Sequence, residues 1–466
     1  MNLRPAYRIT LLVCCVALVA CTDQPAASTV AGPPRVSSDR SSGDVNPVIV
    51  ALVRQMAAQR GIVPLVRPER VRPQLVHLGQ ALIFDPILSG NRNIACASCH
   101  LPAFATGDGK ALSIGEGGSD LGPARTHPHG VFIPRNAPPL FNLFAKKHLF
   151  WDGRVQVVNG ELRTPAGDKL TPAMKRVLEF GPASVLAMFP VTNRFEMRGD
   201  ASSGNELGAI ADDDFNGIWA GLMRRLGSIP EYRALFEAAY PGTRFSDMNF
   251  AHASNAIGGF MIDKLSFNNT PWDKFMRGDD KALSPRQLAG AQTFLSLKCS
   301  ICHTGATFSD QDFHNIAVAQ IGPGEGDGAN GRDDFGRMRV TGRDADRYRF
   351  ATTPLRNVEL TGPYGHNGSI SSLRDFVAHY SESHLKLQNF DIMTLEPALR
   401  GTLQPTSSAI LAQRDTLLNG VVFDAAILDK LMDYMAALTD PDARDLSHLT
   451  PARVPSKLDG VPGGKK

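Results

Sequence analysis

The chain has 466 residues and a formal net charge of +3, and its composition is 43 % hydrophobic and 20 % charged. This length exceeds what a single hydrophobic core usually takes, so we expect two domains. The near-neutral charge, without any block of basic residues, argues against nucleic acid as a partner.

The first twenty residues have the pattern of a signal peptide. Arg4 and Arg8 precede an apolar stretch over residues 9–20, which is too short to span a bilayer. The small residues before Cys21 resemble a bacterial lipobox, in which the cysteine is acylated and becomes the mature N-terminus. An ordinary cleaved signal is the alternative. We expect an exported protein on the periplasmic side, anchored to a bacterial membrane through a lipid on Cys21.

The next segment predicts a tether. Residues 22–46 are rich in Ser, Pro, Ala and Gly and have few large apolar side chains, so they cannot form a core. We therefore expect the lipidated cysteine and a flexible tether over residues 21–46. An N-terminal haem domain over 47–275, a C-terminal haem domain over 276–452 and a flexible tail over 453–466 should follow.

The haem assignment rests on two copies of one pattern. Cys96-Ala97-Ser98-Cys99-His100 and Cys299-Ser300-Ile301-Cys302-His303 both match Cys-x-x-Cys-His, in which two thiols add to the haem vinyl groups and the histidine ligates iron. The alternatives are a zinc site split over two Cys-x-x-Cys pairs and a thioredoxin-like dithiol. Neither needs a histidine directly after each pair, so we predict two covalently bound c-type haems. The predicted cofactor-binding residues are Cys96, Cys99, His100, Cys299, Cys302 and His303.

The elements around these sites are predicted to be mainly helical. Ser284 and Pro285 are a good N-cap and first residue for a helix that runs into the second haem motif. Apolar residues at three-to-four spacing predict the other helices. These cover residues 218–226, 230–240, 250–264, 372–380 and 424–438.

Two long connections rich in Gly and Pro lie between the predicted elements, over residues 113–139 and 322–336. The second contains Asp327, Asp333 and Asp334, which could suggest calcium. Their spacing is not that of an EF-hand loop, so a solvated loop is the favoured interpretation.

Further motifs flank the two haem patterns. They are residues 82–86 (Leu-Ile-Phe-Asp-Pro), 88–90 (Leu-Ser-Gly), 135–138 (Arg-Asn-Ala-Pro), 150–154 (Phe-Trp-Asp-Gly-Arg), 353–357 (Thr-Pro-Leu-Arg-Asn) and 360–368 (Leu-Thr-Gly-Pro-Tyr-Gly-His-Asn-Gly). In this order, over roughly residues 78–437, the chain resembles the dihaem bacterial cytochrome c peroxidase family, which has MauG as a close relative. The resemblance implies a mainly α fold of two cytochrome c-like haem domains packed against each other.

The resemblance also implies roles for the two haems. His100 would be the proximal ligand of a peroxide-reacting haem, and His303 that of an electron-transfer haem. A calcium ion would lie between the domains, held by the Asn136 side chain and the backbone carbonyls of Thr361 and Pro363, since hard oxygen donors suit this ion. Plain turn chemistry is the alternative for Asn136 and Thr361.

One departure concerns access to the peroxide-reacting haem. The gated peroxidases carry a blocking histidine in a Ser-Ile-Gly-His phrase, where this chain has Ser113-Ile114-Gly115-Glu116. A carboxylate is a weaker ligand for haem iron than imidazole, so we expect this haem to be open without prior reduction. His127 and His129 could substitute from a nearby flexible loop.

A second departure concerns the C-terminal haem. The peroxidases place a methionine fourteen residues after the histidine of the Pro-Tyr-x-His phrase, and the corresponding count from His366 reaches Tyr380. MauG-like enzymes have a tyrosine there, and a phenolate ligand lowers the potential of haem iron. We predict Tyr380 as the sixth ligand. The alternatives are that it belongs to a helix core, or that His379 takes its place.

The acid-base residue is not determined by the motifs. The family uses a glutamate downstream of its Trp-Asp-Gly-Arg phrase, whereas residues 185–189 contain none. Glu116, Glu161 and Glu196 are candidates by their nearness in sequence to family phrases, with Glu116 and Glu196 preferred. Surface or structural roles are the alternative for each.

Three functions remain open. The leading one is a peroxidase that reduces hydrogen peroxide to water with electrons from a small c-type cytochrome or cupredoxin. The second, favoured by Glu116 and Tyr380, is a MauG-like oxidase that uses peroxide-derived high-valent haems on a protein or organic substrate. The third is an electron-transfer cytochrome without catalysis.

Trp151 and Phe141 could carry charge between the haems, although aromatic packing is the alternative.

Overall fold

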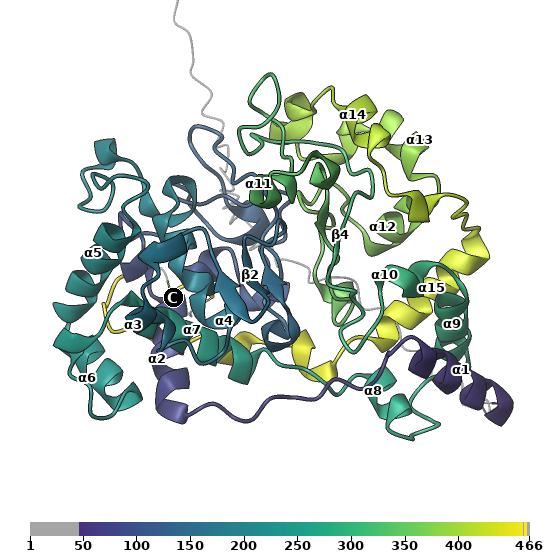
Figure 1. The fold of residues 1–466 in the computed structure, drawn as a ribbon, viewed down its shortest axis with the longest axis horizontal. Helices are drawn as coiled ribbons and strands as arrows, with labels where there is room; N and C mark the ends of the chain where they lie inside the picture. The colour runs from purple at the N-terminus through teal and green to yellow at the C-terminus, as the bar shows by residue number, and fades with distance from the viewer. Residues whose placement is uncertain (1–45, 460, 464–466) are drawn as a thin grey trace, which may run out of the picture. The chain divides into compact units, whose positions relative to one another are not determined.

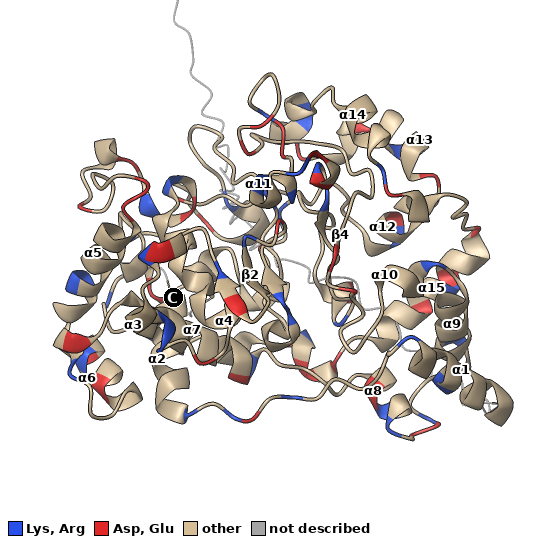
Figure 2. Ribbon diagram, in the orientation of Figure 1, with Lys and Arg blue, Asp and Glu red and all other residues tan. Residues whose placement is uncertain are grey.

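The computed structural model describes residues 46–459 and 461–463 (Figure 1). The expected signal peptide, the expected lipid on Cys21 and nearly all of the expected tether lie outside these residues. Within them, helices predominate and the strands form two small sheets. The mainly α fold class is therefore confirmed. Lys and Arg are interspersed with Asp and Glu over the described helices (Figure 2).

The α-helices in chain order are α1 Pro47–Gln59, α2 Pro73–Phe84, α3 Pro172–Lys175, α4 Pro182–Val185, α5 Phe215–Gly227, α6 Pro230–Ala239, α7 Phe250–Lys264, α8 Pro271–Met276, α9 Pro285–Ser296, α10 Cys299–Cys302, α11 Met338–Thr341, α12 Leu373–His379, α13 Ser383–Gln388, α14 Ser407–Ala412 and α15 Ala425–Ala437. Each helix predicted from apolar spacing is present. The helix before the second haem motif ends at Ser296, because Leu297 adopts an extended conformation. The motif itself starts a separate short helix, α10.

The strands are short. An antiparallel sheet contains β1 (His148–Leu149), β2 (Val155–Val158) and β3 (Glu161–Arg163), with Leu149 opposite Val155 and Val157 opposite Leu162. The second sheet pairs β4 (Phe313–His314) with β5 (Phe350–Ala351). These strands hold connecting segments between the helical parts in place.

Two main hydrophobic cores account for the packing. The N-terminal core contains buried residues of α2, α4, α5, α6 and α7, and the C-terminal core contains those of α8, α9 and α15. Capping explains where several of these helices begin. The Ser284 hydroxyl accepts a hydrogen bond from the Gln287 amide, and the Gln287 side chain accepts one from the Ser284 amide, so the first turn of α9 is capped in both directions.

The ends of the described chain pack against the more distant core. Val50 and Val53 of α1 are buried in the C-terminal core, and α1 lies beside α9 in Figure 1. Near the other end, Val454 is buried in the N-terminal core and the Ser456 hydroxyl donates to Asp85 Oδ1 at 2.6 Å. The described part of the expected flexible tail is therefore anchored by apolar burial and hydrogen bonds.

We expect Gly79→Ala to lower the free energy of unfolding by about 1–3 kcal/mol, because α2 and α7 approach closely at this residue. A Cβ atom on Gly79 would lie 2.0 Å from the carbonyl oxygen of Ala256 in α7. Gly401→Ala is the matched control, since a Cβ atom there meets nothing within 4 Å. Urea unfolding of both variants measures the difference. Equal midpoints would contradict the close packing described for α2 and α7.

Candidate functional site

The first Cys-x-x-Cys-His motif lines a cavity of about 150 Å³, here called the N-terminal cavity. Cys96 and Cys99 are half-buried free thiols, and burial raises the pKa of Cys96 to about 12. Burial lowers the pKa of His100, so its imidazole is neutral. Nδ1 of His100 lies 2.8 Å from the Thr106 carbonyl oxygen. With the proton on Nδ1 donating to this carbonyl, Nε2 keeps a lone pair for a metal.

The second motif lines a larger cavity of about 440 Å³, the C-terminal cavity. Its thiols are again free and half-buried, and burial raises the pKa of Cys299 to about 12. His303 repeats the arrangement of the first motif. Burial lowers its pKa, and its Nδ1 lies 3.1 Å from the Phe308 carbonyl oxygen. Two unrelated stretches of chain thus present the same donor set beside a cavity.

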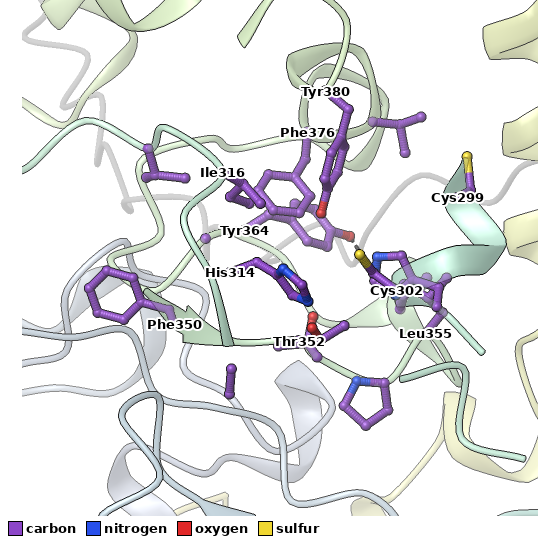
Figure 3. A pocket seen from close by; sticks show the side chains of 18 of the residues that line it. Cys299, Cys302, His314, Ile316, Phe350, Thr352, Leu355, Tyr364, Phe376 and Tyr380 are labelled. Carbon is purple, nitrogen blue, oxygen red and sulfur yellow. Dashed lines mark hydrogen bonds between the residues drawn. The ribbon is translucent and has the colours of Figure 1, made fainter. Parts of the chain in front are cut away.

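Tyr380 faces the C-terminal cavity. Figure 3 shows its ring projecting from the end of α12 toward the space beside Cys302. Burial raises the pKa of its hydroxyl, with the two cysteines as smaller causes. The competing candidate His379 does not line this cavity, because its Nε2 lies 2.8 Å from the Ile316 carbonyl oxygen. The geometry therefore favours Tyr380 over His379 as a group that reaches the cavity of the second motif.

The three glutamate candidates occupy different environments. Glu116 does not line the N-terminal cavity, and its Oε1 accepts hydrogen bonds from Asn91 and Asn93 at 2.7 and 3.0 Å. Glu161 is exposed on β3. Glu196 lines the N-terminal cavity, and burial raises the pKa of its carboxyl group. The structure thus brings only Glu196 of the three to the cavity of the first motif.

Local structure explains the position of Glu196. It lies in a single π-helical turn, η9 (Arg194–Arg198), a distortion that often occurs at functional sites. The Asn193 side chain caps this turn by accepting hydrogen bonds from the amides of Phe195 and Glu196 at 2.8 and 3.0 Å. The π-helical turn and its cap therefore place Glu196 at the cavity. The spacing of apolar residues in the sequence does not indicate such a turn.

Sequence reasoning missed Glu325. It lies in the connection over residues 322–336 and lines the N-terminal cavity from the C-terminal half of the chain. Its carboxylate lies 3.4 Å from Arg135, and burial raises its pKa. Arg135 also binds Asp334 at 2.7 Å and Asp152 at 2.6 Å. No motif links Glu325 to the cavity, since the contact exists only after the two halves pack.

The interpretation of residues 322–336 as a solvated loop holds for residues 328–332, which are exposed, but not for the two acids that follow them. Asp333 and Asp334 are 3 % and 2 % exposed, because this connection packs into the protein around Arg135. Asp333 accepts a hydrogen bond from the Tyr348 hydroxyl. Burial alone would raise the pKa of Asp334, but the charge and hydrogen bonds of Arg135 produce a net decrease. These acids are therefore structural partners of an arginine and a tyrosine.

The three expected calcium ligands line the same cavity. Asn136, Thr361 and Pro363 all line the C-terminal cavity. The Asn136 Nδ2 group donates to the carbonyls of Lys110 and Ala111 at 2.9 and 3.2 Å, which leaves Oδ1 as the donor atom for a cation. The arrangement is compatible with the expected oxygen ligands.

Trp151 lines both cavities, and its indole nitrogen donates to the Asn136 carbonyl at 2.9 Å. Phe141 lines only the C-terminal cavity and packs edge-on against Phe267. Neither His127 nor His129 lines the N-terminal cavity. Of the two aromatic candidates, Trp151 has the better position for electron transfer between the cavities.

Comparisons with known proteins agree with this geometry. A family profile described as di-haem cytochrome c peroxidase matches residues 73–281. Cytochrome c551 peroxidase of Pseudomonas aeruginosa is 30 % identical over 325 residues, which is 69 % of this chain and 76 % of that protein. The chain belongs to the di-haem cytochrome c peroxidase family. It is an oxidoreductase of the peroxidase type with two c-type haems.

This chain is also similar to proteins of the MauG type. The methylamine utilization protein MauG of Methylorubrum extorquens is 26 % identical over 428 residues, covering 91 % of this chain and 96 % of that protein. A crystal structure of a MauG-like protein associated with microbial copper homeostasis matches 82 % of this chain and 95 % of its own, with a TM-score of 0.55 and 24 % identity. The structural likeness concerns the fold alone.

The residues of both cavities fit a c-type haem. Each cavity offers two free thiols for the vinyl groups and an imidazole whose Nε2 is not engaged by the protein. The C-terminal cavity is lined largely by apolar side chains, as a macrocycle requires; Leu355, Phe376 and Met435 are among them. The chemistry of the donor set therefore matches the cofactor of the family.

Proposed function

We propose that this enzyme reduces hydrogen peroxide to water with electrons from a small c-type cytochrome or a cupredoxin. The observation that carries the proposal is Glu196, a half-buried residue whose carboxyl group lines the same cavity as the first haem motif. The haems supply the redox chemistry when bound. What the protein adds at this site is a proton carrier and an enclosed space for the substrate.

The cofactor-binding roles follow from the motifs and their positions. Cys96 and Cys99 would form the thioether bonds of the N-terminal haem, and His100 would ligate its iron. In the C-terminal cavity, Cys299, Cys302 and His303 would take the corresponding roles. Asn136, Thr361 and Pro363 would hold a calcium ion at the wall of the C-terminal cavity.

Glu196 would act as the acid-base group. Heterolysis of a peroxide bond needs a group that takes the proton from one oxygen and returns it to the departing oxygen. The raised pKa of Glu196 suits this exchange, because burial makes its carboxyl group hold a proton more readily than an exposed glutamate does. Glu116, held by Asn91 and Asn93, would have a structural role.

The N-terminal site would be open in the fully oxidised enzyme. Among the described residues that line its cavity, His100 is the only histidine. Glu116 turns toward two asparagines and does not block the site. No imidazole from this cavity is therefore available as a second axial ligand.

A MauG-like oxidase is the second candidate function. The observation that favours it is the direction of Tyr380, which lines the C-terminal cavity and points toward the space beside Cys302 (Figure 3). A phenolate ligand would stabilise ferric iron and lower the potential of this haem. Such a haem is a poorer acceptor for electrons from a donor protein, so oxidation of a protein or organic substrate becomes the competing outcome.

We place the enzyme on the periplasmic side of a bacterial membrane, since covalent haem attachment takes place after export. Acylation of Cys21 would provide the anchor. Over residues 46–459 and 461–463, none of the helices combines the length and apolarity required for a membrane span.

The test is to mix the fully oxidised enzyme with one equivalent of hydrogen peroxide and follow the Soret band and the high-spin ferric EPR signal. We expect the signal to collapse within milliseconds, followed by steady-state turnover with a reduced c-type cytochrome or cupredoxin. Collapse without donor turnover, but with oxidation of an added tryptophan-containing protein, would favour the second candidate. No reaction before reduction would contradict the open site, and no reaction after it would favour a non-enzymatic cytochrome.

A further inference from the structure

A small set of residues separates the two cavities. The residues that line both are Asn136, Pro138, Pro139, Lys146 and Trp151. Lys146 is the only one of these with an ionisable side chain. A single lysine thus faces both predicted haem sites.

Among the described cations around the cavities, Lys146 is the one that is shielded from solvent in part and has no carboxylate partner. No ion pair with a carboxylate of the described residues affects it, and burial is the sole cause that lowers its pKa, to about 8. The three arginines that line the cavities and His314 are each bound to at least one carboxylate, whereas Lys298 is exposed and donates to backbone carbonyls. The pairs are Arg135 with Asp152 and Asp334, Arg154 with Asp152, Arg356 with Asp273, and His314 with Asp310 and Asp415.

The backbone around Lys146 is held by the C-terminal half of the chain. The Gln311 side chain accepts a hydrogen bond from the Lys147 amide at 2.6 Å and donates one to the Ala145 carbonyl at 2.8 Å. The Gln311 carbonyl oxygen also lies 3.0 Å from His148 Nε2. These contacts fix the segment that carries Lys146 against the other half, while the neighbouring Lys147 is exposed.

Lys146 is half-buried, and an ammonium group withdrawn from solvent without an anion beside it is unfavourable unless a ligand supplies the charge. Each haem brings two propionate carboxylates, which are the missing anions. We propose that Lys146 binds propionate groups of both haems and, as their shared counter-ion, raises both reduction potentials. This inference rests on the proposed placement of one haem in each cavity.

The direction of the effect follows from electrostatics. Reduction adds one electron to a haem, and a nearby positive charge stabilises the added negative charge. Loss of the Lys146 charge therefore disfavours the reduced form in both cavities. Because Lys146 lines both cavities, one substitution should shift the reduction potentials of both haems in the same direction.

The experiment measures the midpoint potentials of both haems by spectroelectrochemistry in Lys146→Gln, Lys146→Arg and Lys147→Gln. We expect Lys146→Gln to lower both midpoints, Lys146→Arg to retain values near those of the unmodified enzyme, and Lys147→Gln to leave both unchanged. Lys147 is the matched control, since it is the adjacent lysine with the same charge but faces solvent. Haem content per polypeptide, measured by pyridine haemochrome absorbance, shows that each variant is loaded.

The proposal is overturned if Lys146→Gln shifts the midpoints no more than Lys147→Gln, or if it shifts only one of them. A variant that loses one haem would be replaced by Lys146→Met, with the same expected shifts. Peroxide turnover does not enter these measurements. An enzyme that failed to reduce peroxide would contradict the proposed function but would leave the comparison of potentials intact.

Discussion

We expect Glu196→Gln to lower kcat for peroxide reduction by about 100- to 10,000-fold, which is the usual contribution of a positioned acid-base group. Glutamine keeps the size of the side chain and removes its proton exchange. The two haems should remain attached, because Glu196 belongs to neither Cys-x-x-Cys-His motif. Stopped-flow mixing with peroxide and steady-state assays with a reduced donor protein would measure the loss.

The pH dependence should identify the same group. The pKa of Glu196 is raised by burial, so its carboxylate form is lost at a higher pH than for an exposed glutamate. Because the carboxylate accepts the first proton, the rate should fall as pH decreases through this raised pKa, and the acid limb should vanish in Glu196→Gln. Glu116→Gln serves as the control with a small expected effect. A large loss in Glu116→Gln with normal turnover in Glu196→Gln would reverse the two roles.

The second large effect concerns stability. We expect Arg356→Met to lower the free energy of unfolding by about 3–5 kcal/mol, the usual cost of leaving one partner of a buried ion pair alone. Arg356 and Asp273 are 1 % and 0 % exposed, and two hydrogen bonds of 2.6 and 2.9 Å join them. The pair joins the segment over residues 353–357 to α8. The loss of stability should therefore appear as a lower midpoint of urea unfolding.

An exposed ion pair provides the control for this prediction. Arg374 and Asp429 lie 2.7 Å apart with 45 % and 58 % of their side chains exposed. Arg374→Met should change stability by no more than about 1 kcal/mol, because solvent screens the charges of such a pair. Similar unfolding midpoints for Arg356→Met and Arg374→Met would mean that the buried pair contributes little.

Local features were predictable from the sequence. The helices α5, α6 and α15 follow from apolar spacing because each buries one face, whereas α7 is buried on all sides. The N-cap of α9 follows from Ser284 and Pro285. The haem motifs were equally clear, because thiols and imidazole must be adjacent in the chain to reach the same macrocycle. The position of Tyr380 beside the C-terminal cavity follows the residue count from His366.

Contacts between distant segments were not predictable. Glu196 and Glu116 are equally good candidates for the acid-base role when only their distance in sequence from the family phrases is considered. The π-helical turn, which brings Glu196 to the cavity, is visible only in the structure. Glu325 and Lys146 reach their positions through packing of the two halves, for which no local pattern exists. The burial of Asp334 depends on Arg135, which lies 199 residues away in sequence.

The exchange of end segments between the two cores has a consequence for the order of assembly during synthesis. The N-terminal core includes Val454 and the hydrogen bond from Ser456 to Asp85, so it is incomplete until almost the whole described chain has been made. The cysteines at residues 96 and 99 are available much earlier, because chains are synthesised from the N-terminus. The N-terminal core therefore closes only after its haem motif has been made and residues 454–456 have packed against it.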